Sequence, residues 1–484
     1  MKQRMSVRNT VISSLLWKLF ERGGRSMVEL IVQIIMARLL APEQFGQLSI
    51  MLVFVNLGNV IVQSGMNTAL IQAPEIHRVD CSTVFWMSFA ISLLLYLVVF
   101  LAAPAIAGFY SSPELIWPLR ALALLFVVNA YNAVQIALIT RKLEMRKIFN
   151  ATVLSSLISA ACGIGCALAG LGVWALVAQQ LSYQISNCLA HAAQLDWMPH
   201  FEFSGESARR LFGFGSRLLA SGLLEQGYQS LSDLVIGRQF STRELGFVSQ
   251  GKRYPQAVGS ILDGAIQPVM LSAVSRVQDD VIQVKRLVRR ALKTSTFLVV
   301  PSMVLFAVVA PELVPLLLGP QWSDCIWFMQ VYCIVYAMLP IHTTNLQALN
   351  GMGRSDLFLK LELVKKAYGV AWIAIAALVI RDVRFMVAGY LVTGILSTVV
   401  NAWPNRRVIG YSYGEQLRDV APAVLLTASA AFVGWAMSLL PVAGAPLVLL
   451  QIIAFAAAYL GLAAALRIEE FSYLASTLRG LLSR

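Results

Sequence analysis

The sequence has little charge and few histidines, and these shortages exclude several classes of protein. Only 13% of the 484 residues are charged, whereas 58% are hydrophobic and the mean hydropathy is +0.70. A soluble domain of this size carries about twice as much charge, so we predict a polytopic membrane protein. The four histidines show no metal-ligand spacing, and no nucleotide-binding motif is present. Both facts argue against a bound metal and against direct use of ATP.

Cysteines and long polar segments are also scarce. The six cysteines lie in or beside apolar segments, and Cys162 and Cys166 share a helix face without an acidic or histidine neighbour. Apolar packing is therefore their predicted role. A membrane polymerase or ligase usually needs a sizeable outer catalytic loop, and no such loop is visible in this sequence. We predict no catalytic residue and no cofactor.

Fourteen apolar segments are long enough to cross a bilayer as helices. They are 11–36, 45–71, 81–107, 115–139, 148–170, 173–194, 210–236, 245–273, 292–318, 325–349, 357–380, 384–403, 420–440 and 446–466. The predicted fold is an all-α membrane protein with two parallel six-helix lobes and two C-terminal helices. The expected parts are an N-terminal lobe (1–195), a cytoplasmic linker (196–210), a C-terminal lobe (211–410), and two extra helices with a cytoplasmic tail (411–484). Residues 2–20 resemble a signal peptide but lack a cleavage site, so we expect them to be retained.

The net charge of +13 could indicate nucleic acid, but the basic residues lie in short loops between the apolar segments. One set of alternate loops holds most of them, including Arg78, Arg141 to Lys147, and Arg276 to Arg290. The other set holds only Arg38, Arg238, Arg243, Arg381 and Arg384. By the positive-inside rule, the richer set and both termini are cytoplasmic, and no nucleic-acid partner is expected.

The first apolar segment carries a polar stripe. Its members recur every three or four residues and so share one helix face: Lys18, Arg22, Arg25, Glu29 and Gln33. A charge at the bilayer centre costs roughly 2.5–3.5 kcal/mol or more, so such side chains usually face a wet interior and often serve a function. The alternative is a short amphipathic segment on the membrane surface, followed by a span that begins near Ser26.

This polar pattern returns 200 residues later in the chain. The matching positions are Arg25, Glu29, Gln33 and Arg38 with Glu225, Gln229, Asp233 and Arg238; Asn56, Gln63 and Asn67 with Gln256, Asp263 and Gln267; and Gly46 and Ser49 with Gly246 and Ser249. The matches place polar groups at the same depths of two helix pairs. They indicate a duplicated bundle with polar faces turned to a shared interior, a pattern typical of transporters.

Several stretches resemble a known family, the polysaccharide exporters of the Wzx type. They are ARLLAPEQFG (37–46), ALIQ and STVFW (within 69–86), FYSSPEL (109–115), ALITRKLEMR (137–146), GLGVWALV (170–177) and SDLVIGRQFSTRELGFVSQGKRYP (232–255). The resemblance covers most of residues 10–420 in order. The superfamily also holds the multidrug and toxin extrusion carriers and the lipid II flippases.

The resemblance implies two lobes in a V shape around a central cavity, in the cell inner membrane. It implies movement of undecaprenyl-pyrophosphate-linked oligosaccharide from the cytoplasmic to the periplasmic leaflet, for lipopolysaccharide, capsule or exopolysaccharide. Membrane lipids, a polysaccharide polymerase and a chain-length regulator are the expected partners. A multidrug antiporter of the same fold would prefer an acidic, aromatic-lined cavity, and a membrane polymerase or ligase is a more distant alternative.

A pyrophosphate carries about two negative charges, and hydrocarbon would oppose its crossing by tens of kcal/mol. Cations and polar amides are therefore the expected substrate-binding groups: Lys18, Arg22, Arg25, Arg217, Lys252, Arg253, Asn56 and Gln63. Arg22 and Arg25 are favoured because guanidinium groups bind phosphate through two hydrogen bonds. Four acids are candidates for proton or sodium coupling, with structural ion pairing as the alternative: Glu29, Glu225, Asp233 and Asp263.

Three other polar clusters are visible in the sequence, and two of them allow alternative roles. Gln180, Gln184, Asn187, His191 and Gln194 recur at helical spacing, and they either line the cavity or bond to neighbouring helices. The basic loop 141–147 either sets the topology or contacts lipid headgroups. The basic stretch 276–293 is expected to form a surface helix that binds anionic lipid.

Overall fold

The computed structural model describes residues 28–63, 65–73, 75–472, 474 and 476. The side chains of residues 214, 217, 262, 263 and 265 are outside this description. The described chain is helical, without strands, and divides into two units, Met1–Gly246 and Phe247–Arg484. The predicted all-α architecture is confirmed. Eleven of the described helices are long and apolar enough to cross a membrane.

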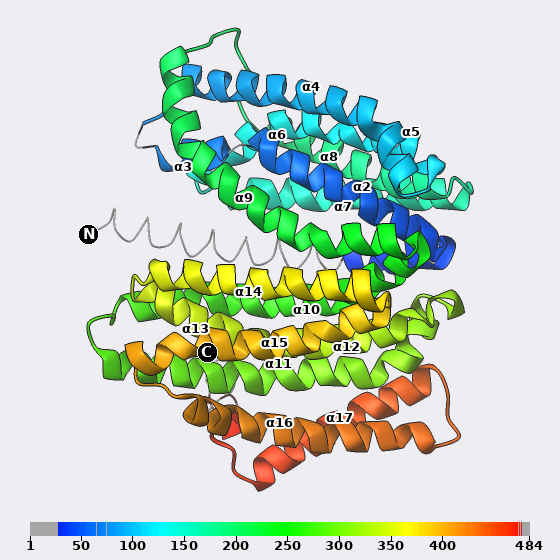
Figure 1. The fold of residues 1–484 in the computed structure, drawn as a ribbon, viewed down its shortest axis with the longest axis vertical. Helices are drawn as coiled ribbons and strands as arrows, with labels where there is room; N and C mark the ends of the chain where they lie inside the picture. The colour runs from blue at the N-terminus through cyan, green and yellow to red at the C-terminus, as the bar shows by residue number, and fades with distance from the viewer. Residues whose placement is uncertain (1–27, 64, 74, 473, 475, 477–484) are drawn as a thin grey trace. The chain divides into compact units, whose positions relative to one another are not determined.

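Unit 1 begins, within the described residues, with a helix over residues 28–39. Its other helices are α2 (Pro42–Gln63), α3 (Met66–Gln72), α4 (Arg78–Phe109), η1 (Pro113–Leu115), α5 (Ile116–Ala123), α6 (Leu125–Arg141), α7 (Met145–Leu168), α8 (Val173–Gln194) and α9 (Gly205–Gln239) (Figure 1). Neither α8 nor α9 is among the eleven apolar helices. Both have the length of a span but carry the polar residues that the sequence pattern indicated.

Unit 2 contains most of α10 (Thr242–Ser275) and all later helices. These are α11 (Val281–Leu317), η2 (Pro320–Trp322), α12 (Cys325–Ala337), α13 (Leu339–Gly351), α14 (Ser355–Ile375), the π-helix η3 (Ala376–Ile380), α15 (Val383–Val408), α16 (Tyr413–Ala436), η4 (Met437–Leu439) and α17 (Ala445–Ala465). The last two spans pack mainly on α11 and on each other. They therefore belong to this unit.

Several predicted segments differ from the structure. The predicted span 115–139 is divided into α5 and α6, and 325–349 into α12 and α13. The predicted span 45–71 is two helices, because the chain turns at Gly65, which has a left-handed φ of 66°. The predicted surface helix at 276–293 is wrong, because α11 runs without a break from Val281 into the apolar span. The side chain of Asp280 caps α11 by accepting a hydrogen bond from the Gln283 amide at 3.0 Å. At 1.5 Å per residue, α11 is about 55 Å long, so its basic first turns extend beyond a bilayer core.

Two helix breaks lie 200 residues apart, at matching positions of the repeat that the sequence predicts. A helix ends at residue 39, two residues break it, and α2 starts at Pro42; likewise α9 ends at Gln239 and α10 starts at Thr242. Gly46 and Gly246 lie at the same point of this pattern. A Cβ on Gly46 would lie 1.7 Å from the Thr242 carbonyl oxygen, and a Cβ on Gly246 would lie 2.0 Å from the Pro42 carbonyl oxygen. The starts of α2 and α10 therefore cross in backbone contact at two glycines.

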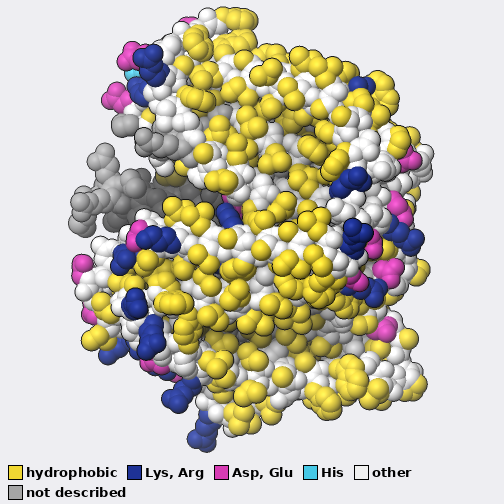
Figure 2. All heavy atoms as spheres, in the orientation of Figure 1, with side chains coloured by type: hydrophobic (Ala, Val, Ile, Leu, Met, Phe, Trp, Pro, Cys, Tyr) yellow, Lys and Arg dark blue, Asp and Glu magenta, His cyan; other side chains and the backbone are white. Residues whose placement is uncertain are grey.

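The surface of unit 1 along α4 is suited to lipid. Leu93, Leu94, Leu97, Val98 and Leu101 are all exposed there. Hydrophobic side chains also dominate the molecular face drawn in Figure 2. Because leucine and valine are favoured in hydrocarbon, this surface of α4 can face lipid.

Arg141, at the end of α6, closes the C-terminal end of α3. Its Nη1 donates to the carbonyl oxygens of Leu70 at 3.0 Å and Ile71 at 3.2 Å, and also to that of Ala73. The last carbonyls of a helix lack intrahelical partners, and a cation satisfies both them and the helix dipole. This residue of the basic loop 141–147 therefore has a structural function that neither sequence interpretation included.

We expect Arg141→Ala to lower the free energy of unfolding by about 2 kcal/mol, because it removes a charged donor from buried carbonyls. Thermal unfolding of the detergent-purified protein measures this effect. Lys142→Ala is the matched control, because Lys142 is the exposed neighbour and removes the same charge from the loop. Equal melting temperatures for the two variants would contradict the capping role.

Candidate substrate path and its polar residues

Unit 1 has a second exposed surface, which is polar rather than apolar. Asn56 and Gln63 on α2 are exposed, and so are Glu225 and Gln229 on α9. The two helices pack side by side. A charged side chain exposed to hydrocarbon is costly, so this face of unit 1 must contact water or other polar groups. We call these four residues the polar face.

Asn56 and Glu225 lie at the same level of the adjacent helices α2 and α9. At 1.5 Å per residue, each lies about 20 Å from the end of its helix, at Pro42 and Gln239 respectively. Glu225 accepts a hydrogen bond from Gln229 Nε2 at 2.7 Å. Asp233 follows on α9 and is half-buried, and Glu29 is exposed on the helix 28–39. An acid and an amide thus lie at the same level of the α2–α9 pair, well inside both helices.

The other predicted site residues lie outside the polar face or outside the described part of the chain. Lys18, Arg22 and Arg25 lie outside the described residues. Arg217 and Asp263 occupy helical positions in α9 and α10, but their side chains are not described. Lys252 and Arg253 are half-buried on α10 in unit 2. Within unit 1, the structure therefore places Asn56, Gln63 and Glu225 from the predicted set on the adjacent helices α2 and α9. Gln33, predicted to share the stripe of Glu29, is instead buried at 1% exposure.

The polar stripe of α8 bonds to neighbouring helices. Asn129 of α6 donates to Asn59 of α2 at 2.8 Å and accepts from Gln184 of α8. One turn further along α6, Asn132 contacts both Asn187 at 3.3 Å and the ring of His191 at 2.8 Å. The second of the two sequence interpretations therefore holds for Gln184, Asn187 and His191. These amides join α2, α6 and α8 behind the polar face.

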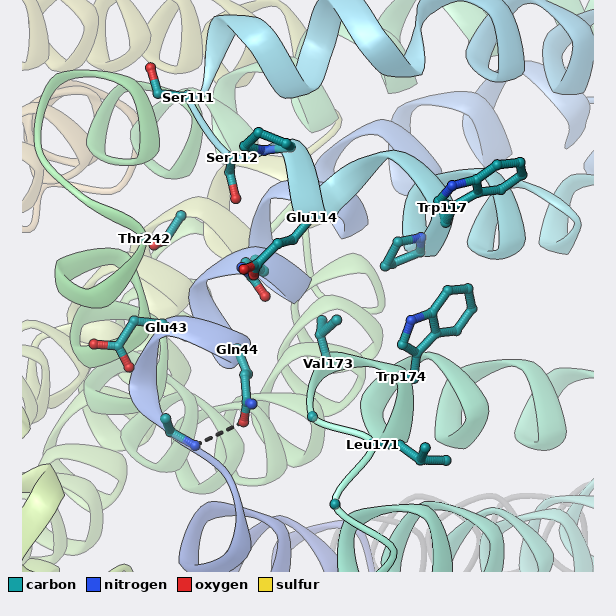
Figure 3. A pocket seen from close by; sticks show the side chains of 16 residues that line it. Glu43, Gln44, Ser111, Ser112, Glu114, Trp117, Leu171, Val173, Trp174 and Thr242 are labelled. Carbon is teal, nitrogen blue, oxygen red and sulfur yellow. Dashed lines mark hydrogen bonds between the residues drawn. The ribbon is translucent and has the colours of Figure 1, made fainter.

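A pocket of about 850 Å³ lies at one end of unit 1, and we call it the end pocket. Four chain segments line it: residues 41–47 at the start of α2, 111–118 between α4 and α5, 170–174 before α8, and Thr242 at the start of α10. Figure 3 shows Trp117 and Trp174 on one side of the pocket and Glu43 and Gln44 on the other, with Glu114 between them. Sequence reasoning missed this site, although the stretches that line it are among those that resemble the exporter family.

Unit 2 has a smaller basic pocket of about 430 Å³ near the start of α11. It is lined by Arg286, Arg289, Arg290, Lys293, Thr294, Glu469 and Glu470. Lys293 Nζ lies 3.0 Å from Glu469 and 2.6 Å from Glu470. The hydrogen bond from Lys293 lowers the pKa of Glu469. Arginines gathered around a hollow can hold a phosphate-bearing headgroup, so binding of anionic lipid by this basic stretch stays a prediction.

Comparison with known proteins finds one matching family and several relatives that are named for polysaccharide biosynthesis. The family described as "Polysaccharide biosynthesis protein" matches residues 35–327. The lipopolysaccharide biosynthesis protein WzxC of Escherichia coli K12 is 23% identical over 420 residues, which cover 85% of this chain and 84% of that protein. The succinoglycan biosynthesis transport protein ExoT of Rhizobium meliloti is 23% identical over 76% of this chain and 75% of its own.

Among solved structures, the inward closed form of the lipid II flippase MurJ has a TM-score of 0.73. It covers 97% of this chain and 100% of its own at 13% sequence identity. This likeness establishes a common fold, and the match to residues 35–327 extends over more than half of the sequence. The chain therefore belongs to the polysaccharide biosynthesis protein family.

Proposed function

We propose that the protein is a flippase for undecaprenyl-pyrophosphate-linked oligosaccharide, which it moves from the cytoplasmic to the periplasmic leaflet by alternating access. The observation that carries the proposal is the polar face, because Glu225 and Asn56 are exposed at the same level, well inside two adjacent helices. A channel for a polar headgroup needs such a hydrated surface, whereas a packing helix does not. Family membership and a relative that is named as a transport protein support the same function.

We place the protein in the inner membrane with both termini in the cytoplasm. The connections at Ser111 and Gly170, which lack Lys and Arg, meet at the end pocket. Arg78 and Arg141 lie at the other ends of α4 and α6. By the positive-inside rule, the end pocket then faces the periplasm.

In this proposal the cations of the predicted site bind the pyrophosphate, and Asn56 and Gln63 contact the glycan. The proposed cations are Lys18, Arg22, Arg25, Arg217, Lys252 and Arg253. The acids Glu29, Glu225, Asp233 and Asp263 bind a proton or sodium ion that couples the cycle. The lipid tail stays in the bilayer, so only the headgroup has to be solvated by the protein. A polymerase and a chain-length regulator would use the exported product.

Translocation by purified protein in liposomes tests the proposal. The substrate is a lipid-linked oligosaccharide with a fluorescent glycan, and a membrane-impermeant quencher reports the leaflet that it occupies. We expect wild-type protein to transfer the label and the double variant Arg22→Ala/Arg25→Ala to lose at least 90% of the rate, because guanidinium contacts to pyrophosphate are removed. Arg406→Ala, which removes an exposed charge from the last turn of α15, is the control.

Three outcomes would refute the proposed function. Wild-type transfer no faster than in protein-free liposomes would exclude a flippase. Extension of the glycan without transfer would indicate a polymerase, and transfer of a lipophilic cation instead would indicate a multidrug antiporter. Normal transfer by the double variant would refute only the role of the two arginines.

A further inference from the structure

We infer that the end pocket is a second substrate-contacting site, which binds a neutral oligosaccharide through two tryptophans and a set of fixed amides and carboxylates. The inference rests on the proposed function, because it assigns the glycan part of that substrate to a site separate from the polar face. Its residues lie in the segments 41–47, 111–118, 170–174 and Thr242. No predicted site residue is among them.

The two indole rings provide flat apolar surfaces at the mouth of the pocket. Trp117 is 64% exposed and Trp174 is 41% exposed. The guanidinium carbon of Arg120 lies 4.8 Å from the centre of the Trp117 ring, which it supports from one side. An exposed indole face can cover the apolar C–H face of a sugar ring and leave the hydroxyl groups at its edge free.

The polar groups of the pocket are held in place before a ligand arrives. Gln47 is only 6% exposed, and its Nε2 donates to Glu114 Oε2 at 2.9 Å. Gln44 Oε1 accepts from the Ala41 amide at 2.9 Å. The remaining N–H groups of these amides can donate hydrogen bonds to sugar hydroxyls, and the second Glu114 oxygen can accept hydrogen bonds from them. Side chains fixed in this way lose little conformational freedom on binding.

The charge of the pocket selects the glycan rather than the pyrophosphate. Glu43 and Glu114 are among the lining residues, and Lys and Arg are absent from those that the structure describes there. Arg243 Nε lies 3.5 Å from Glu43 and offsets its charge. Glu114 accepts a hydrogen bond from the neutral amide of Gln47, so its carboxylate disfavours a pyrophosphate, whereas uncharged hydroxyls are good donors to it. The volume of about 850 Å³ lies in the range of ordinary small-ligand sites and is enough for several sugar rings.

The simpler explanation of the tryptophans is an aromatic belt at the membrane surface. A belt residue needs no pocket and no ordered carboxylate beside it. Here the rings, the Gln47–Glu114 pair and the Gln44–Ala41 bond surround one hollow, which four distant chain segments build. All four segments overlap stretches that resemble the exporter family: ARLLAPEQFG, FYSSPEL, GLGVWALV and SDLVIGRQFSTRELGFVSQGKRYP.

Binding of free oligosaccharide tests this inference without requiring transport. The probe is the repeat-unit oligosaccharide released from the host's own surface polysaccharide, titrated calorimetrically into the full-length protein in nanodiscs. We expect Trp117→Ala and Trp174→Ala each to weaken binding by about tenfold, and Glu114→Gln by about threefold. Trp435→Ala, which removes an exposed tryptophan from α16, is the matched control and should bind as wild type does.

Each outcome decides the question. Absence of wild-type binding at millimolar oligosaccharide, or equal binding by Trp117→Ala and Trp435→Ala, would overturn the inference and leave the belt explanation. Competition by inorganic pyrophosphate or by a lipophilic cation would also overturn it, because it would reveal a different ligand. The proposed function fails in a different way. If the protein binds the free glycan at this pocket but transfers no lipid-linked substrate, the inferred site stands and the flippase proposal is refuted.

Discussion

Replacing Gly46 or Gly246 with alanine is expected to prevent accumulation of folded protein in the membrane. A methyl group on Gly46 would lie 1.7 Å from the Thr242 carbonyl oxygen, and one on Gly246 would lie 2.0 Å from the Pro42 carbonyl oxygen. Both neighbours are backbone atoms, so no side-chain rotation can relieve the overlap. Overpacking usually costs about 1–3 kcal/mol, and a clash with backbone lies at or above the upper end of that range.

Size-exclusion chromatography of detergent extracts measures this effect. We expect Gly46→Ala and Gly246→Ala to elute as aggregate or to yield less than a tenth of the wild-type monomer peak. Gly165→Ala is the matched control, because Gly165 is also helical and nothing lies within 4 Å of the position that its new methyl group would take. That substitution should be neutral or should stabilise the helix by up to about 1 kcal/mol. A normal monomer peak for Gly46→Ala would show that the two helix starts can separate at little cost.

The helices could be predicted from the sequence because a bilayer restricts the chain so strongly. Every backbone polar group in hydrocarbon must be bonded internally, so each apolar run of sufficient length becomes a helix. The described parts of the fourteen predicted segments are helical, apart from short breaks. The break at Gly65 could not be seen, because Met66 to Gln72 continues the apolar pattern. The continuity of α11 was missed because its basic first turns looked like a separate surface segment.

The candidate site was predictable only in part, for physical reasons. Periodicity identified the polar residues of α9 and α8, but it does not say whether an amide contacts water or another helix. Gln184 and Glu225 look alike in the sequence, yet Gln184 bonds to Asn129 whereas Glu225 is exposed. The end pocket has no periodic signal, because Gln47, Glu114 and Trp174 come from three helix starts far apart in the chain.

Removing Arg289 is expected to destabilise unit 2 more than any other single charge change at the start of α11. Arg289 binds Asp419 of α16 through Nε at 2.6 Å and Nη2 at 2.8 Å. Asp419 is 6% exposed, and it also accepts a hydrogen bond from the Tyr411 hydroxyl at 2.8 Å. Burial raises the pKa of Tyr411, so this hydroxyl keeps its proton and donates. Arg289→Ala would leave a buried carboxylate without its cation, at a cost of about 3 kcal/mol.

A double-mutant cycle on thermal stability separates this pair from its surroundings. Asp419→Asn in the Arg289→Ala background should recover part of the lost stability, because the uncompensated charge disappears while the shape of the side chain is kept. Arg286→Ala, one turn earlier and exposed, removes the same charge and should change the melting temperature little. If Arg289→Ala and Arg286→Ala had the same melting temperature, the contact between α11 and α16 would depend on apolar packing alone. The buried cluster of Phe297, Leu426 and Phe455 would then be sufficient to hold the last two spans on this unit.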